Sequence, residues 1–151
     1  MSARTWPRHA MTGLYWFLAL EFALGAITKY WPGETFFGPP YSTQFVEWGY
    51  PSWMRFPVGT LEGLAAILLV IPSRRTRFLG ATTLMFVLTG AVTTHIINHD
   101  GLTESWAAPT HLIITGILAL TNWPADWRDL LLRAPTPPTA RALHPTKQQH
   151  A

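Results

Sequence analysis

The stretch that decides the fold is Met54-Arg-Phe-Pro-Val-Gly-Thr-Leu-Glu-Gly-Leu-Ala-Ala-Ile-Leu-Leu-Val-Ile-Pro72, which is largely apolar and carries a single carboxylate, Glu62. At ~1.5 Å per residue, a helix of these 19 residues is roughly 28 Å long, close to the ~30 Å hydrocarbon core of a bilayer. A charged side chain at that depth costs about 2.5 kcal/mol or more. We therefore expect Glu62 to face the interior of a helical bundle and to have a partner there.

Three further apolar segments of similar length, 12–30, 78–98 and 108–124, flank this one. The connections between the second, third and fourth segments are short, so sequential helices should run antiparallel. The sequence predicts an all-α integral membrane protein, a four-transmembrane antiparallel helix bundle with helices at about 12–30, 54–72, 78–98 and 108–124. Residues 1–11 are expected to form a cytoplasmic N-terminus, 12–130 the transmembrane domain and 131–151 a disordered cytoplasmic tail.

The connection between the first two helices, residues 31–53, contains four prolines and eight aromatic residues. Prolines exclude one continuous helix, and aromatic rings at this density favour the headgroup region of a membrane. Residues 42–48 could form one or two helical turns on the surface. The loop is therefore predicted to be extracytoplasmic and to act either as an interfacial anchor or as a lid.

Basic residues set the orientation and limit the function classes. The N-terminus, the 73–77 turn and the C-terminal segment hold most of them: Arg4, Arg8, Arg74, Arg75, Arg77, Arg128, Arg133, Arg141 and Lys147. By the positive-inside rule, both termini are cytoplasmic. These residues form no basic face with interleaved aromatics, so no nucleic-acid partner is expected. The chain has no cysteine, which excludes disulfides, thiolate metal sites and thiol chemistry from its own residues.

Ionisable residues occur in every predicted span. These residues are Glu21 in the first, Glu62 in the second, His95 in the third, with His99 at its end, and His111 in the fourth. Their depths place four of them in one half of the bundle, while His99 is expected to be exposed. We predict a site with Glu62 as principal acid, His95 as its base or orienting partner, and Glu21 and His111 in support. The residues predicted to line it are Trp48, Tyr50, Thr94, Asn98 and Thr115.

A carboxylic acid removed from water holds its proton more readily and can act as an acid near neutrality beside an imidazole base. This composition suits isomerisation, epoxide opening or cyclisation of a lipophilic small molecule that enters from the lipid bilayer. No cofactor and no metal site are predicted, although a quinone, a haem or a metal bound by His and Glu stays open. The alternative is a non-catalytic membrane assembly or adaptor protein, with a membrane-protein partner or a homo-oligomer as further options.

Four motifs resemble the DoxX-like family of small bacterial membrane proteins. They are Phe45-Val-Glu-Trp-Gly-Tyr-Pro-Ser-Trp53, Gly59-Thr-Leu-Glu-Gly-Leu-Ala-Ala-Ile-Leu-Leu-Val-Ile-Pro72, Arg77-Phe-Leu-Gly-Ala81 and Gly90-Ala-Val-Thr-Thr-His95. The resemblance covers roughly residues 12–122, and Glu62 and His95 match positions typical of the pattern. It implies a four-helix bundle in the bacterial cytoplasmic membrane. Because the family's namesake is a subunit of a quinone-linked thiosulfate oxidoreductase, a membrane subunit of such an enzyme is a further alternative.

Overall fold

The computed structural model describes residues 6–36 and 38–124. Within these ranges the chain is helical, and its only β pairing is an isolated bridge between Thr35 and Gly38. The elements are α1 (Trp6–Tyr30), α2 (Tyr41–Glu47), a 3₁₀ turn η1 (Ser52–Met54), α3 (Arg55–Val70), α4 (Arg74–Ile97), α5 (Leu102–Ser105) and α6 (Ala107–Thr121). The all-helical class predicted from the sequence is therefore confirmed for this part of the chain.

Prolines account for several helix boundaries. The α1 helix ends two residues before Pro32, and α3 ends two residues before Pro72, since the residue preceding a proline disfavours helical geometry. Pro57 and Pro109 each lie in the first turn of their helix, where no intrahelical N–H bond is lost. Helix α1 begins six residues before the predicted start at 12, and the short helix α5 was not predicted. The helical turns predicted at 42–48 correspond to α2.

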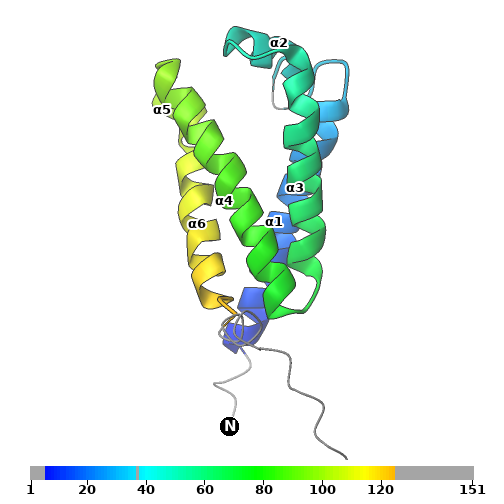
Figure 1. The fold of residues 1–151 in the computed structure, drawn as a ribbon, viewed down its shortest axis with the longest axis vertical. Helices are drawn as coiled ribbons and strands as arrows, with labels where there is room; N and C mark the ends of the chain where they lie inside the picture. Colours follow the sequence, from blue (N-terminus) through cyan, green and yellow to red (C-terminus); the bar gives the residue numbers. More distant parts are fainter. Residues whose placement is uncertain (1–5, 37, 125–151) are drawn as a thin grey trace, which may run out of the picture.

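The four longer helices run in alternating directions, with α1 against α3, α3 against α4 and α4 against α6 (Figure 1). Each contributes one leucine that is almost fully removed from solvent: Leu18, Leu69, Leu84 and Leu118. These leucines occupy the half of the molecule near the 71–73 turn. The apolar core therefore lies at this end, which we call the turn end, and the opposite end is called the α2 end.

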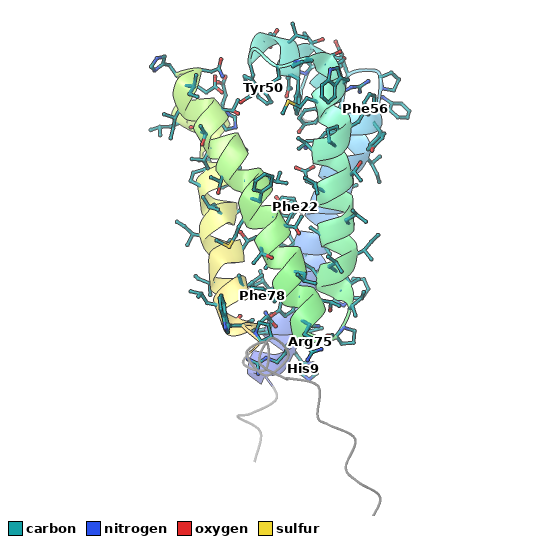
Figure 2. All side chains as sticks on the ribbon, in the orientation of Figure 1. His9, Phe22, Tyr50, Phe56, Arg75 and Phe78 are labelled. Atoms are coloured by element: carbon teal, nitrogen blue, oxygen red, sulfur yellow. The ribbon has the colours of Figure 1, made fainter. Side chains whose placement is uncertain are left out.

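Helix α1 packs on α3 and helix α4 packs on α6, which makes two helix pairs. Helices α3 and α4 are closest near the turn end and separate toward the α2 end, where α2 lies between the two helix pairs (Figures 1 and 2). A Cβ atom added at Gly80 would lie 2.9 Å from the Ala65 carbonyl oxygen, so the two backbones meet there. Helices α1 and α6 are joined mainly through side chains, including a 2.6 Å hydrogen bond from Asn122 Nδ2 to the Tyr15 hydroxyl. A buried polar contact thus ties α1 to the end of α6.

Three helical segments of the described chain are long and apolar enough to cross a membrane: His9–Tyr30, Ser52–Val70 and Arg74–Ile97. Helix α6 has 15 residues and is not among them. The fourth span and the orientation of the termini therefore stay predictions. The tail predicted at 131–151 lies outside the described residues.

The end of α4 suggests a test of backbone strain. His99 has a φ of 57°, the left-handed conformation that glycine adopts without a steric cost. Its N–H bonds the Ile96 carbonyl at 3.3 Å, and the Asp100 N–H bonds the His95 carbonyl at 3.1 Å, which is the Schellman pattern. We expect His99→Gly to raise the free energy of unfolding by about 0.5 kcal/mol. Reversible unfolding in mixed micelles measures this change in stability. Gly49 also has a positive φ, of 82°, so the opposite kind of substitution, Gly49→Ala, should lower the free energy of unfolding.

Candidate functional site

A buried ion pair joins α1 to α3. The Lys29 ammonium donates a hydrogen bond to Glu62 Oε2 at 2.7 Å, and each side chain keeps only 9% of its surface exposed. Burying two charges costs several kcal/mol each, and their attraction offsets that cost only where the geometry is good. Glu62 thus faces the protein interior as expected, but its partner is Lys29 rather than an imidazole.

Aromatic and backbone contacts hold the lysine in place. Its Nζ atom lies 4.4 Å from the centre of the Tyr41 ring at the start of α2, which is a cation–π contact. Arg55 donates from Nη1 to the carbonyl oxygens of Lys29 and Trp31, at 2.8 and 3.1 Å, and so satisfies the end of α1. A cation near the C-terminal carbonyls of a helix is also favoured by the helix dipole. The ion pair is therefore fixed from both α2 and α3.

A second polar pair joins α1 to α6. His111 Nε2 lies 3.0 Å from Glu21 Oε2, and its other nitrogen, Nδ1, lies 2.7 Å from the Ala107 carbonyl oxygen. A carbonyl oxygen only accepts, so Nδ1 must carry a hydrogen. The contact between Nε2 and Oε2 then requires one more proton, located either on the imidazole or on the carboxyl group. A hydrogen bond between the two side chains therefore places one proton between Nε2 and Oε2, where either group can hold it.

The two members of this pair differ in exposure. The His111 side chain is 14% exposed and packs edge-on against Phe22, with ring centres 5.7 Å apart. The Glu21 side chain is 43% exposed, although it lies near the middle of the His9–Tyr30 segment. A polar group at this depth is costly when it faces lipid. Glu21 therefore offers an accessible carboxyl group in the apolar part of the molecule.

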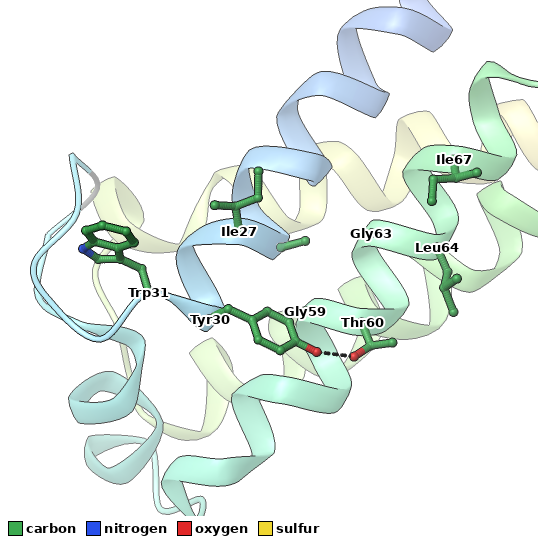
Figure 3. Close-up of a pocket in the computed structure, with 9 residues that line it drawn as sticks. Ile27, Tyr30, Trp31, Gly59, Thr60, Gly63, Leu64 and Ile67 are labelled. Carbon is green, nitrogen blue, oxygen red and sulfur yellow. Dashed lines mark hydrogen bonds between the residues drawn. The ribbon is translucent and has the colours of Figure 1, made fainter.

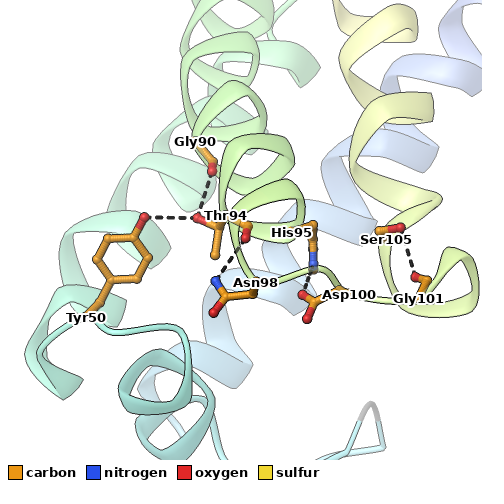
Figure 4. Close-up of polar contacts among 8 residues, drawn as sticks. All are labelled: Tyr50, Gly90, Thr94, His95, Asn98, Asp100, Gly101 and Ser105. Carbon is orange, nitrogen blue, oxygen red and sulfur yellow. Dashed lines mark hydrogen bonds and ion pairs between the residues drawn. The ribbon is translucent and has the colours of Figure 1, made fainter.

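The third polar pair lies at the α2 end. His95 Nδ1 lies 2.6 Å from Asp100 Oδ2 (Figure 4). Trp48 contacts the same His95 ring edge-on, with ring centres 5.6 Å apart. Beside it, the Tyr50 hydroxyl and Thr94 Oγ1 are 3.1 Å apart. Trp48 and Tyr50 follow α2, so these contacts attach the loop segment to α4. We call residues 41–50 the strap, because Tyr41 lies on Lys29 at one end while Trp48 and Tyr50 lie on α4 at the other.

The predicted site residues are thus divided among three polar pairs. Glu21 and His111 contact each other, whereas the structure pairs Glu62 with Lys29 and His95 with Asp100. Three of the predicted lining residues donate hydrogen bonds to carbonyl oxygens of their own helices. Thr94 donates to Gly90 at 2.9 Å, Asn98 to Thr94 at 2.9 Å and Thr115 to His111 at 2.8 Å. His99 is exposed, as expected. Across the described ranges, no three His, Asp or Glu side chains lie together as a set of metal ligands.

Two apolar hollows lie on the α1 side of the described surface. One, of about 490 Å³, runs between α1 and α3 beside the 2.6 Å contact between the Tyr30 and Thr60 hydroxyls (Figure 3). The other, of about 400 Å³, lies under residues 34–36. Neither is lined by Glu21, Glu62, His95 or His111. The single shared cavity predicted for these four residues is not one of these hollows.

Sequence reasoning missed Lys29 and Asp100 as partners. Lys29 lies at the end of the first apolar segment, and it and Glu62 lie near the same end of two adjacent antiparallel spans. Opposite charges at similar depths on neighbouring helices are a usable signal for an ion pair. Asp100 follows His95 by five residues, a spacing that only becomes a contact because the chain reverses at His99.

The strap contact gives a prediction of its own. Tyr50→Phe removes the hydroxyl that contacts Thr94, and we expect it to weaken the attachment of the strap to α4 by about 1 kcal/mol. Because the chain has no cysteine, spin labels can be placed at Val46 on α2 and Ile96 on α4, both of which are exposed. The variant should broaden their distance distribution. A pair of labels at Leu20 and Leu64 on α1 and α3 is the control and should not change.

Comparison with known proteins gives a family for the chain. The family model described as the DoxX-like family matches residues 13–120, well over half of the chain. The comparisons with curated proteins and with solved structures give no match. Three helical segments of membrane-spanning length and composition lie within or overlap the matched range, so the chain is a membrane protein and belongs to the DoxX-like family.

Proposed function

We propose that the protein binds a lipophilic small molecule from the bilayer and catalyses acid–base chemistry on it, with Glu21 and His111 as the proton-transferring pair. The observation that carries the proposal is the contact of Glu21 Oε2 with His111 Nε2, because the Ala107 carbonyl fixes a hydrogen on Nδ1. Carboxyl and imidazole groups that share one proton can exchange acid and base roles with little rearrangement. This assigns the principal role to a pair that the sequence placed in support.

The Lys29–Glu62 pair supports the proposed acid–base chemistry because it places a second charged group inside the helical bundle. Ionisable residues inside membrane segments are rare, and they mark functional sites by default. A fixed ammonium group close to the reacting part of a bound molecule stabilises negative charge that develops during proton abstraction. Isomerisation of a double bond through an enolate uses this combination of a proton-transferring pair and a charge stabiliser, and opening of an epoxide uses it where negative charge develops on the oxygen.

Solvent deuterium provides the test. Purified protein in nanodiscs is incubated in D₂O with a bacterial membrane lipid extract, and mass spectrometry follows lipids that gain deuterium bound to carbon. We expect such gain with the unchanged protein and a loss of at least ~100-fold in rate for Glu21→Gln or His111→Gln. A matched control is Glu104→Gln, since Glu104 is an exposed carboxylate in α5. Equal gain in empty nanodiscs, or in the Glu21 variant, would rule the proposal out.

A non-catalytic membrane module is the competing interpretation, because each polar pair between helices also ties the bundle together. Glu21–His111 joins α1 to α6, and Lys29–Glu62 joins α1 to α3. If the pairs serve stability alone, the Gln variants will unfold more easily while no lipid gains deuterium with any form of the protein. A quinone-linked subunit would instead copurify with a redox protein and show no carbon-bound deuterium.

A further inference from the structure

Gly25 lies between the two polar pairs on one face of α1. Glu21, Gly25 and Lys29 follow each other at intervals of four residues, a spacing that places them above one another on a helix. A Cβ atom at Gly25 would lie 3.5 Å from Glu62 Oε2 and 3.9 Å from Lys29 Nζ, and beyond the backbone of α1 it would meet nothing else within 4 Å. The missing side chain therefore opens directly onto the ion pair.

Helix packing does not require glycine at this position. At Gly59, by contrast, a Cβ would lie 3.1 Å from Lys29 Cβ and 3.2 Å from the Ala26 carbonyl oxygen, closer than ordinary contacts. The Gly25 contacts are ordinary van der Waals distances. Because glycine inside a helix costs up to about 1 kcal/mol relative to alanine, its presence needs another reason. Gly25 is partly exposed, and a side chain there would cover Lys29 and Glu62, so glycine keeps the ion pair accessible.

The positions of the Glu21–His111 and Lys29–Glu62 pairs along α1 limit the size of a ligand that could contact both. Helical side chains lean toward the N-terminus, which puts the Lys29 ammonium near Gly25 and shifts the Glu21 carboxyl group in the same direction. The two residues are eight positions apart, so the two groups lie about two turns, or ~12 Å, apart along the axis. An oxygen atom beside Lys29 and a carbon about four bonds away, at ~1.2–1.5 Å per bond, cover most of that distance once a contact distance at each end is added. Of the three ammonium donors, Glu62 accepts one and Tyr41 lies against the group, which leaves a donor for a ligand oxygen.

We propose that the site takes a lipophilic enone, whose carbonyl oxygen rests over Gly25 and accepts a hydrogen bond from Lys29. This assignment rests on the proposed function and names its substrate class. The Glu21 carboxylate removes a proton from the carbon beyond the C=C bond, which is conjugated with the carbonyl. The C–H electron pair forms a new C=C bond, the electrons of the old C=C bond shift toward the carbonyl carbon, and the carbonyl π electrons move onto oxygen, where Lys29 stabilises the charge. Return of the proton from Glu21 to the same or a conjugated carbon restores the carboxylate.

A simple enone tests the assignment without knowledge of the natural substrate. Protein in nanodiscs is mixed with 3-undecen-2-one in D₂O, and mass spectrometry measures deuterium at the carbon on the alkyl side of the C=C bond. We expect exchange faster than in empty nanodiscs, and at least a tenfold loss in both Lys29→Met and Gly25→Val. The matched control is Gly90→Val on α4, where a Cβ would meet nothing within 4 Å, and it should keep the full rate.

Two results would overturn the assignment. One is exchange in Gly25→Val at the unchanged rate, with the variant shown by circular dichroism and gel filtration to be folded. The other is no exchange of 3-undecen-2-one by a protein that still places deuterium into membrane lipids in a Glu21-dependent manner. The second result rejects the enone class and leaves the proton-transferring pair intact, whereas loss of both reactions rejects the proposed function itself.

Discussion

Replacing Lys29 with methionine is expected to lower the free energy of unfolding by about 3–5 kcal/mol. The substitution removes the only charged partner that the described structure gives to Glu62, whose side chain is 9% exposed, and leaves a carboxyl group in an apolar interior. It also removes the ammonium group from the Tyr41 ring. The hydrogen bonds from Arg55 go to backbone carbonyls at residues 29 and 31, so the end of α1 stays capped.

Denaturant unfolding in mixed micelles, followed by circular dichroism, measures this loss. The double variant Lys29→Met with Glu62→Leu removes both charges and should recover most of the stability, because the penalty comes from the unpaired carboxyl group. Glu62→Gln alone leaves the lysine with a neutral acceptor and should fall between the two. A Lys29→Met protein that unfolds like the unchanged one would mean that the pair is solvated and contributes little.

Much of the fold follows from hydropathy and proline positions. The apolar runs 12–30, 54–72 and 78–98 correspond to α1, α3 and α4, since a segment of this kind satisfies its backbone polar groups in a membrane by forming a helix. Pro32 and Pro72 predict the C-terminal ends of α1 and α3, which the structure places two residues before each proline. Local sequence could not show that α3 and α4 would diverge from Gly80, because that divergence depends on tertiary contact between two backbones.

The pairings within the candidate site were harder to predict for the same reason. Helical spacing identifies which residues of one helix share a face, but it does not say which neighbouring helix that face meets. Glu62 lies on the face of α3 that packs on α1, so it meets Lys29. Topology places Glu21 and His111 in the same half of the bundle, and in the structure they contact each other. Partner choice for the other residues required the arrangement of the helices.

Gly80→Leu is the second substitution with a large expected effect, a loss of about 3 kcal/mol in the free energy of unfolding. The added Cβ would lie 2.9 Å from the Ala65 carbonyl oxygen, 3.1 Å from Leu68 Cβ and 3.2 Å from the Leu69 backbone nitrogen. Two of these three neighbours are backbone atoms, which cannot rotate away as the end of a side chain can. Helices α3 and α4 must therefore move apart where Leu69 and Leu84 pack into the core.

The same replacement at Gly90 is the control, because a Cβ there meets nothing within 4 Å and leucine is a better helix former than glycine. Gly90→Leu should unfold at or slightly above the denaturant concentration of the unchanged protein, while Gly80→Leu unfolds well below it. Since Gly80 lies at the turn end and the strap at the other, Gly80→Leu should also change the distance between labels at Val46 and Ile96. An unchanged distance and stability would show that the close contact at Gly80 does not hold the two helix pairs together.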